Sequence, residues 1–175
     1  MSEIARTKTH SVMVGSVQVG GGAPVSVQSM CTTKTDDPDA TLLQIKGLAE
    51  AGCEIIRVAI PDAKALDGFE EICKYSPLPV VADIHFDYKL ALEASKRGAA
   101  ALRINPGNIG SMERVDAVIE AAKEAHIPIR IGVNAGSLAK EFDTRQDMTL
   151  VEKLVASSKS FVEHFSSRGF DDIVL

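Results

Sequence analysis

The stretch that decides the fold of this sequence is PVVADIHFDYKLALEASKRGAAALRINPGN, residues 79–108. Two short apolar runs lie in this stretch, the first beginning one residue before it, and we predict them as strands over Leu78–Ile84 and Ala100–Asn105. Neither run alternates with polar residues, as is typical of strands that are covered on both faces. Between them lies an amphipathic segment that Asp87 opens and that stops near Gly98, which predicts a helix. A strand, a helix and a second strand in this order predict a parallel pair.

The same unit recurs along the chain. Further apolar runs of this kind predict strands at Ala23–Met30, Glu54–Ile60, Ile127–Asn134 and Asp171–Leu175. Polar residues follow nearly every strand, which favours a closed barrel over a doubly wound sheet with one switch point. A complete (β/α)8 barrel needs about 250 residues. We therefore predict an α/β fold, a (β/α)8 TIM barrel that is incomplete here, with about six strands and an end that looks cut inside an apolar strand.

A hairpin is predicted ahead of the barrel. Val12–Val14 and Val17–Val19 flank Gly15-Ser16, a two-residue turn signal with glycine first. We place this hairpin under the sheet as a plug and the triple glycine that follows it as a flexible hinge. The predicted domains are an N-terminal hairpin and hinge over residues 1–22 and a partial TIM barrel over residues 23–175.

Composition excludes several classes of protein. The chain has 175 residues, of which 45% are hydrophobic and 25% charged, typical of a folded domain rather than a disordered chain. A formal net charge of -5 argues against nucleic-acid and anionic-membrane partners, since both need a basic surface. No apolar run approaches the roughly 18 residues of a membrane span, and the N-terminus lacks a signal-peptide pattern. Three widely spaced cysteines fit a reducing compartment, so we expect a cytoplasmic protein.

Charged and amide side chains gather at the predicted strand ends. Residues two apart on a strand share a face, so we expect one inward-facing set at the barrel mouth. Its members are Arg57, Asp83, His85, Arg103, Asn105, Arg130 and Asn134. Arginine inside an apolar strand is costly unless it is paired, and one aspartate cannot neutralise three guanidiniums. Because arginine suits bidentate phosphate contacts, the set predicts a phosphorylated or diphosphorylated small molecule as ligand.

Structural roles for the same residues stay open as alternatives. Arginines on barrel strands also pair with carboxylates of neighbouring helices in purely structural networks. Asp83 could act as a general acid or base, although we favour a role as partner of an arginine. A histidine at a strand end, such as His85, is as often a hydrogen-bonded structural group as a catalyst. We place His85 and Gln28 as supporting residues behind the binding groups and assign no catalytic residue.

The cysteines predict no metal site within this chain. Cys53 and Cys73 fall at positions expected in the core, one just after a helix end and one on a helical stripe. Cys31 stands at a strand end and is the one cysteine placed to meet a ligand. None of the three forms a Cys-x2-Cys pair, the spacing typical of zinc and iron–sulfur sites.

Four strings of residues resemble one enzyme family, in the same order along the chain. They are VQSM at 27–30, ADIHFD at 82–87, LRINPGNIG at 102–110 and IRIGVNAGS at 129–137. From about residue 9 to residue 175 the chain resembles 4-hydroxy-3-methylbut-2-enyl diphosphate synthase, an iron–sulfur enzyme family of the non-mevalonate isoprenoid pathway. The resemblance implies a TIM barrel followed by a smaller domain that holds a [4Fe-4S] cluster on three cysteines and one glutamate.

The resemblance also implies a reaction, partners and site residues. The reaction is reductive ring opening and dehydration of 2-C-methyl-D-erythritol 2,4-cyclodiphosphate, with electrons from reduced flavodoxin or ferredoxin, in a head-to-tail homodimer. By motif match, Arg57, Arg103 and Arg130 resemble the family's diphosphate-binding arginines. The positions that resemble its further polar contacts with substrate are Asp83, Asn105 and Asn134.

The chain departs from the family pattern in two ways. Cys31 stands where the family commonly has threonine or asparagine, a small polar change that should preserve binding. The remaining strands, a family lysine and the cluster domain are outside the chain. We therefore expect the cluster and the redox activity in the full-length enzyme, and an inactive fragment without cofactor here.

Two other classes stay open at this point. One is a different phosphate- or pterin-binding TIM-barrel enzyme resembling dihydropteroate synthase, and the other is a non-catalytic ligand-binding module. A Cys-x2-Cys pair and a further cysteine in the downstream reading frame would favour the synthase.

Overall fold

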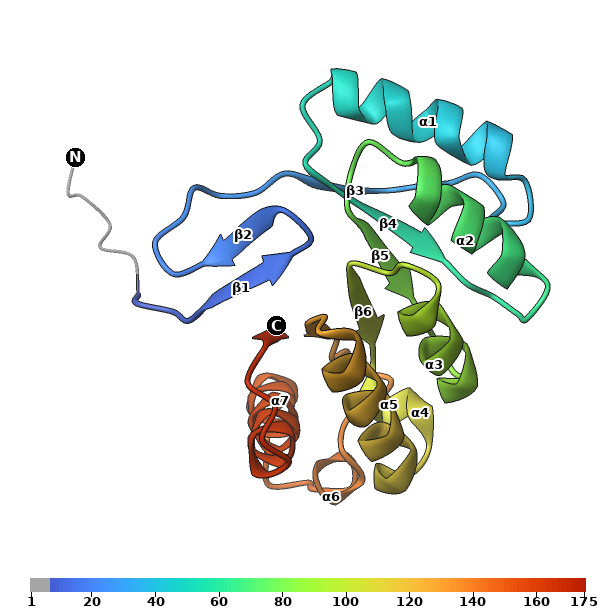
Figure 1. Ribbon diagram of the computed structural model, residues 1–175. Helices are drawn as coiled ribbons and strands as arrows, with labels where there is room; N and C mark the ends of the chain where they lie inside the picture. The colour runs from blue at the N-terminus through green and yellow to red at the C-terminus, as the bar shows by residue number, and fades with distance from the viewer. Residues whose placement is uncertain (1–6) are drawn as a thin grey trace.

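A curved parallel sheet with helices on its outer side makes up most of the molecule (Figure 1). The computed structural model describes residues 7–175. Six strands pair in chain order, and every pairing among them is parallel. Their bounds are β3 (Gln28–Met30), β4 (Ile55–Ala59), β5 (Val80–Asp83), β6 (Ala101–Ile104), β7 (Ile129–Ile131) and β8 (Ile173–Val174). The predicted α/β class and partial TIM barrel are confirmed, because each connection returns through a helix to the next strand along the sheet.

The connecting helices are of two kinds. Within residues 7–175, five helices are nine to eighteen residues long, and two have four residues each. The long ones are α1 (Pro38–Glu50), α2 (Ala65–Tyr75), α3 (Tyr88–Lys96), α5 (Met112–Ala125) and α7 (Leu150–Ser167). The short ones are α4 (Pro106–Ile109) and α6 (Lys140–Asp143). None of these described helices is both long and apolar enough to cross a bilayer.

Three of the five long helices begin at a residue whose side chain caps the first turn. Asp37 precedes α1 and its side chain accepts a hydrogen bond from Ala40 N at 3.1 Å. Asp87 precedes α3 and accepts from Lys89 N at 3.0 Å. Thr149 opens α7 with a reciprocal capping box to the glutamate three residues later. Each cap gives a free backbone N–H of the first turn a partner, which fixes where the helix starts.

Three features differ from the sequence prediction. The strand predicted over Ile127–Asn134 is shortened to β7, Ile129–Ile131. The strand predicted over Ala23–Met30 is reduced to β3, because it is an edge strand that pairs only with β4 and contains Pro24, which has no N–H to donate. Val25 in the lost part is 81% exposed. The short helices α4 and α6 were not predicted, since four residues are too few to show an amphipathic period.

Two apolar clusters lie on opposite faces of the sheet. The outer cluster packs strand residues such as Ile56 and Leu102 against the helices. The inner cluster joins the hairpin to the first halves of three strands, through Val14, Ile55, Val81 and Ala101. Since successive side chains on a strand point to opposite faces, the residues that follow this inner cluster by two positions also point inward.

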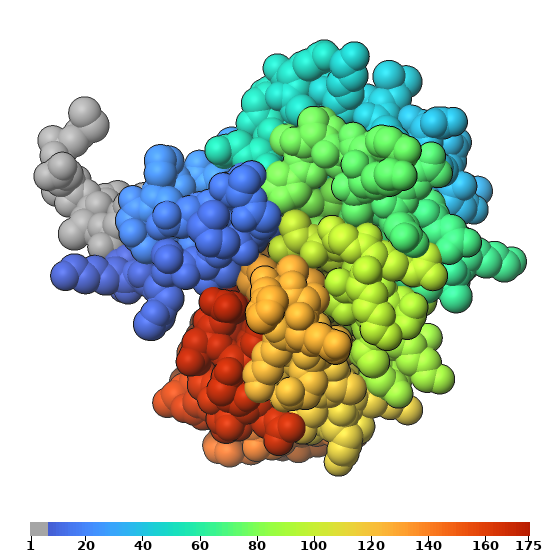
Figure 2. All heavy atoms as spheres, in the orientation of Figure 1, coloured from blue at the N-terminus to red at the C-terminus, as the bar shows by residue number. Residues whose placement is uncertain are grey.

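The hairpin consists of β1 (Ser11–Val14) and β2 (Val17–Gly20), paired antiparallel. Gly15 begins the turn with φ of +57°, in the left-handed region. A Cβ on Gly15 would lie 2.7 Å from Pro79 Cβ, so the turn sits against the residues that lead into β5. In the space-filling view the hairpin packs against the body of the molecule (Figure 2). It therefore closes the end of the sheet at which the strands begin.

The predicted division into residues 1–22 and 23–175 stays a prediction. Residues 1–6 of the first unit lie outside the described residues. Gly20, Gly21 and Gly22 all have positive φ, so the segment between hairpin and sheet adopts backbone conformations that other residues rarely take.

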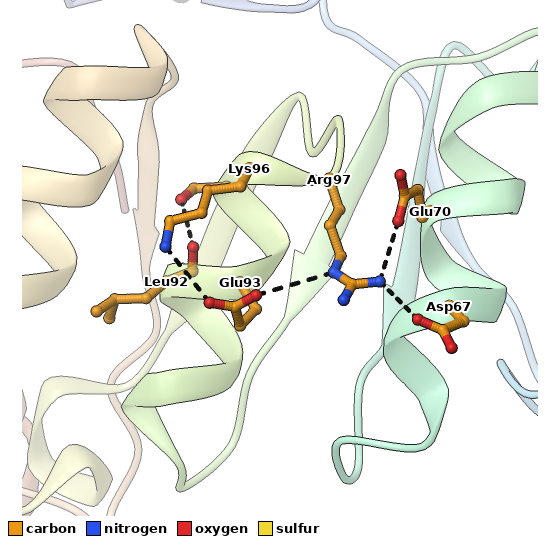
Figure 3. A network of polar contacts seen from close by, with 7 residues as sticks. Asp67, Glu70, Leu92, Glu93, Lys96 and Arg97 are labelled. Carbon is orange, nitrogen blue, oxygen red and sulfur yellow. Dashed lines mark hydrogen bonds and ion pairs between the residues drawn. The ribbon is translucent and has the colours of Figure 1, made fainter.

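On the outer surface, one arginine joins three acidic side chains of α2 and α3 (Figure 3). Arg97 Nη1 donates to Asp67 Oδ1 at 2.7 Å and to Glu70 Oε2 at 3.0 Å, both on α2. Its Nε lies 4.0 Å from Glu93 Oε2 on α3. The network ties the C-terminal end of α3 to the neighbouring helix of the outer layer.

Candidate functional site

Three neighbouring strands share one pattern on their inner face. On β4, β5 and β6, an apolar residue of the inner cluster is followed two positions later by a charged residue. These pairs are Ile55 and Arg57, Val81 and Asp83, and Ala101 and Arg103. The register places Asp83 beside Arg103, and Arg103 beside Arg130 of β7. The inner face therefore has an apolar floor over the hairpin and, above it, a charged layer, which we call the arginine cluster (Arg57, Asp83, Arg103 and Arg130).

Asp83 lies at the centre of the arginine cluster. Its side chain is 1% exposed. Arg103 Nη1 donates to its Oδ1 at 3.1 Å, and Arg57 Nε lies 3.3 Å from its Oδ2. The second contact is an ion pair without hydrogen-bond geometry, so these two buried atoms lack a hydrogen-bond partner within residues 7–175. The two atoms nevertheless belong to opposite charges in direct contact, so the ion pair compensates in part for the missing hydrogen bond.

Arg130 has a different partner. Its Nη1 donates to Gln28 Oε1 of β3 at 2.7 Å. Three strands separate β3 from β7 in the sheet, so this contact crosses the concave interior and requires the strong curvature of a barrel. Gln28 and Arg130 also line a cavity of about 350 Å³ between the hairpin and the inner face. Gln28 is thus placed directly on one of the predicted binding groups.

The charges of the arginine cluster do not balance. Three guanidiniums surround one carboxylate, which leaves two positive charges in excess. Burial lowers the pKa of Arg130, and the neighbouring charges of Arg57 and Arg103 lower it further. Both effects mean that the cationic form of Arg130 is held at a cost in free energy. A bound anion would reduce this cost, because its charge opposes the excess.

His85 stands at the outer edge of the cluster. Its Nε2 lies 3.5 Å from Asp83 Oδ2, and its side chain is 46% exposed. The ring thus lies beside Asp83, with much of it in solvent. Its role as a structural group or as a catalyst stays a hypothesis.

The two asparagines form a second group, which lies in the loops that follow β6 and β7. Asn105 is 1% exposed; its Oδ1 accepts from Gly107 N at 3.1 Å, and its Nδ2 donates to Ser137 Oγ. Ser137 Oγ in turn donates to Asn134 Oδ1 at 2.7 Å. Asn134 Oδ1 also accepts from Gly136 N at 3.0 Å, as in an Asx turn. The side chains of Asn105 and Asn134 therefore meet through Ser137 and connect two loops of the mouth.

Three residues of the site were not singled out from the sequence. Ser137 joins the two asparagines, and no local pattern shows a contact between loops of different strands. Met30 Sδ accepts from Arg57 Nη2 at 3.1 Å. Gly132 lies against the guanidinium of Arg103. The last two follow an inward-facing residue by two positions, so strand alternation could have identified them.

The three cysteines are free thiols, and two of them, Cys31 and Cys53, are buried. Burial raises the pKa of Cys31 to about 11, with a smaller effect of Cys53, and burial raises the pKa of Cys73 to about 12. Among residues 7–175, no three histidines, cysteines or carboxylates gather as metal ligands.

Curated relatives in bacteria cover nearly all of this chain. A relative in Clostridium acetobutylicum is 54% identical over 170 residues, 97% of this chain and 49% of the relative. One in Geobacter sulfurreducens is 51% identical over 168 residues, 96% of this chain and 48% of the relative. Both bear the name 4-hydroxy-3-methylbut-2-en-1-yl diphosphate synthase (flavodoxin). The chain spans about half the length of the curated relatives it matches.

Solved structures share the fold at low sequence identity. Dihydropteroate synthase from Stenotrophomonas maltophilia superposes with a TM-score of 0.68 at 13% identity, over 94% of this chain and 64% of that chain. A truncated 3-deoxy-D-arabino-heptulosonate 7-phosphate synthase from Thermotoga maritima gives 0.65 at 15% identity, over 96% and 56%. These likenesses show the barrel architecture alone.

A family model decides between these likenesses. The model described as the GcpE TIM-barrel domain matches residues 9–175. This is the stretch over which the sequence strings resemble the synthase family, and it includes the whole parallel sheet. The chain therefore belongs to the GcpE TIM-barrel domain family.

Proposed function

We propose that the arginine cluster binds the diphosphate of a small-molecule substrate. The observation that carries the proposal is the excess of two positive charges around the buried carboxylate of Asp83. The side chains of Arg57 and Arg103 are 25% and 19% exposed, so each is largely shielded from bulk water and still partly accessible. Guanidiniums in such a setting make strong, bidentate contacts with phosphoryl oxygens.

The names of the curated relatives, which are diphosphate synthases, support a more specific proposal. We propose that the complete enzyme carries out reductive ring opening and dehydration of 2-C-methyl-D-erythritol 2,4-cyclodiphosphate to 4-hydroxy-3-methylbut-2-enyl diphosphate. In this proposal the chain supplies the part of the barrel that binds and orients the diphosphate. Asn105 and Asn134 are the proposed further polar contacts with the substrate, while His85 beside Asp83 and Gln28 beside Arg130 support the arginine cluster. Fixing the diphosphate in one orientation turns the reaction of the rest of the substrate into an effectively unimolecular step.

The redox part of the proposal lies outside these residues. We assign no electron-transfer step to the described residues, among which no three histidines, cysteines or carboxylates gather as metal ligands. We propose a [4Fe-4S] cluster and a homodimer for the full-length enzyme, which we place in the cytoplasm. Flavodoxin is the proposed electron donor, in line with the relatives' name, and ferredoxin is the alternative.

The proposal is tested by calorimetric titration of the complete gene product with inorganic pyrophosphate and with the cyclodiphosphate. Arg57→Met, Arg103→Met and Arg130→Met should each weaken binding by ~2–4 kcal/mol, or about 30- to 1000-fold, the cost of truncating one partner of a buried charge pair. Arg145→Met is the matched control, because Arg145 is 51% exposed and pairs with Asp147 outside the sheet. Equal losses in the control and in the three cluster variants would overturn the proposal.

A further inference from the structure

The inward-facing position after Arg130 is occupied by glycine. Gly132 continues the ladder of β7, since its N–H donates to Ile104 O at 2.8 Å. Its φ lies outside the left-handed region in which glycine is favoured. The backbone at this position therefore accepts any residue, and the reason for glycine has to be sought in the space beside it.

That space holds the guanidinium of Arg103. A Cβ at position 132 would lie 2.5 Å from Arg103 Nη2 and 2.9 Å from both its Cζ and its Nε. These distances are well below van der Waals contact, and they involve three atoms of the guanidinium group. The guanidinium of Arg103 therefore occupies the space that a side chain at position 132 would need, while its Nη1 donates to Asp83 Oδ1 at 3.1 Å.

The register explains why Arg103 needs this space. Arg103 and Arg130 are direct neighbours on paired strands, and two like charges in such positions repel. The side chain of Arg103 avoids Arg130 by lying over the next inward position of β7, which is residue 132. A side chain at position 132 would have to displace the guanidinium of Arg103 from its present position.

We propose that Gly132 is a positioning residue, whose missing side chain fixes the guanidinium of Arg103 for diphosphate binding. The inference rests on the proposed function, in which Arg103 binds the diphosphate directly. An added methyl group must move the guanidinium by about 1 Å to restore ordinary contact, and a misplacement of that size costs up to about a hundredfold in a positioned interaction. Gly132 thus acts through Arg103 and touches no ligand in this proposal.

The test is calorimetric titration of the complete gene product with inorganic pyrophosphate. Gly132→Ala should weaken binding about 10- to 100-fold. Gly136→Ala is the matched control: its Cβ would lie 3.6 Å from Asn134 Oδ1, an ordinary contact, and its φ is also outside the left-handed region. The control should bind within about twofold of the unchanged protein, because it leaves Arg103 in place. Equal binding by Gly132→Ala and the unchanged protein would overturn the inference.

A double-variant cycle separates positioning from a general structural effect. In an Arg103→Ala background there is no guanidinium to displace, so adding Gly132→Ala should leave pyrophosphate affinity at the level of Arg103→Ala alone. A further loss in that background would contradict a role through Arg103. If Gly132→Ala alone fails to fold, the double variant should recover the thermal transition of Arg103→Ala, and continued failure would equally contradict the inference.

The two proposals fail in different ways. Failure of the unchanged protein to bind pyrophosphate or the cyclodiphosphate overturns the proposed function. In that case the thermal transitions of Gly132→Ala and of the double variant still test the contact with Arg103. Tight binding by the unchanged protein together with full binding by Gly132→Ala overturns only the positioning role.

Discussion

Replacing Asp83 with asparagine removes the one negative charge of the arginine cluster and keeps the shape of the side chain. The carboxylate is 1% exposed and faces Arg57 at 3.3 Å and Arg103 at 3.1 Å. An amide has one oxygen and one NH2 group, so in either orientation an N–H donor faces a guanidinium or the ring of His85. Loss of one partner of a buried ion pair costs about 3–5 kcal/mol. The guanidiniums are partly exposed and water screens them, so we expect Asp83→Asn to lower the free energy of unfolding by ~2–4 kcal/mol.

Urea denaturation of the complete gene product measures this change. Asp87→Asn is the matched control, since it makes the same chemical change at an exposed helix cap, where asparagine is as good a cap as aspartate. The control should unfold within about 0.5 kcal/mol of the unchanged protein. Equal stabilities of Asp83→Asn and the unchanged protein would refute the assignment of Asp83 as the residue that holds Arg57 and Arg103 together.

The same variant makes a second, opposite prediction for anions. Without Asp83 the excess of the cluster rises from two positive charges to three. Phosphate or pyrophosphate should then raise the melting temperature of Asp83→Asn by more degrees than that of the unchanged protein, because ligand binding to the folded state adds to its stability. A smaller anion response in the variant would contradict the view that the cluster is an anion site.

Two further predictions concern the surface and the cysteines. Arg97→Met breaks the contacts with Asp67 and Glu70. Because exposed ion pairs are weak and are screened by salt, the variant should have a slightly lower melting temperature at low salt and an unchanged one at about 1 M salt. A lower melting temperature that persists at high salt would contradict this. Burial raises the pKa of Cys31 from 9.0 to about 11, and that of Cys73 from 9.0 to about 12. Between pH 9 and pH 11 the thiols ionise in the unfolded chain but stay neutral in the folded one. The contribution of these thiols to the free energy of unfolding should therefore be constant below about pH 9 and should fall as the pH rises from 9 towards 11. At pH 8 both thiols should react with iodoacetamide far more slowly in the folded protein than in urea, and equal rates would refute this.

Local patterns in the sequence were enough for the fold. Apolar runs with little polar alternation mark covered strands, and Asp37, Asp87 and Thr149 mark the helix starts, as the structure confirms. The alternation of strand residues also placed Arg57, Asp83 and Arg103 on one face. These signals act over a few residues and depend on backbone hydrogen bonds that form within one element or between neighbours, so a linear pattern carries them.

Contacts across the interior could not be predicted in the same way. The hydrogen bond between Arg130 and Gln28 joins residues 102 positions apart, and it exists because the sheet curves enough to bring β7 towards β3. The link from Asn105 through Ser137 to Asn134 depends on how two loops fold over the ends of β6 and β7. Curvature and loop packing are set by the whole sheet and its helices, and no single segment encodes them.

The sequence by itself determined the order of the strands and the long helices, the inward face of each strand and the excess of arginine at the strand ends. Only the tertiary structure decided which groups pair: Asp83 with Arg57 and Arg103, and Arg130 with Gln28. It also decided that the guanidinium of Arg103 occupies the space that a side chain at position 132 would need. The physical reason is that alternation fixes the face on which a side chain lies, whereas its partner depends on strand register and sheet curvature, which arise when all the strands pack together.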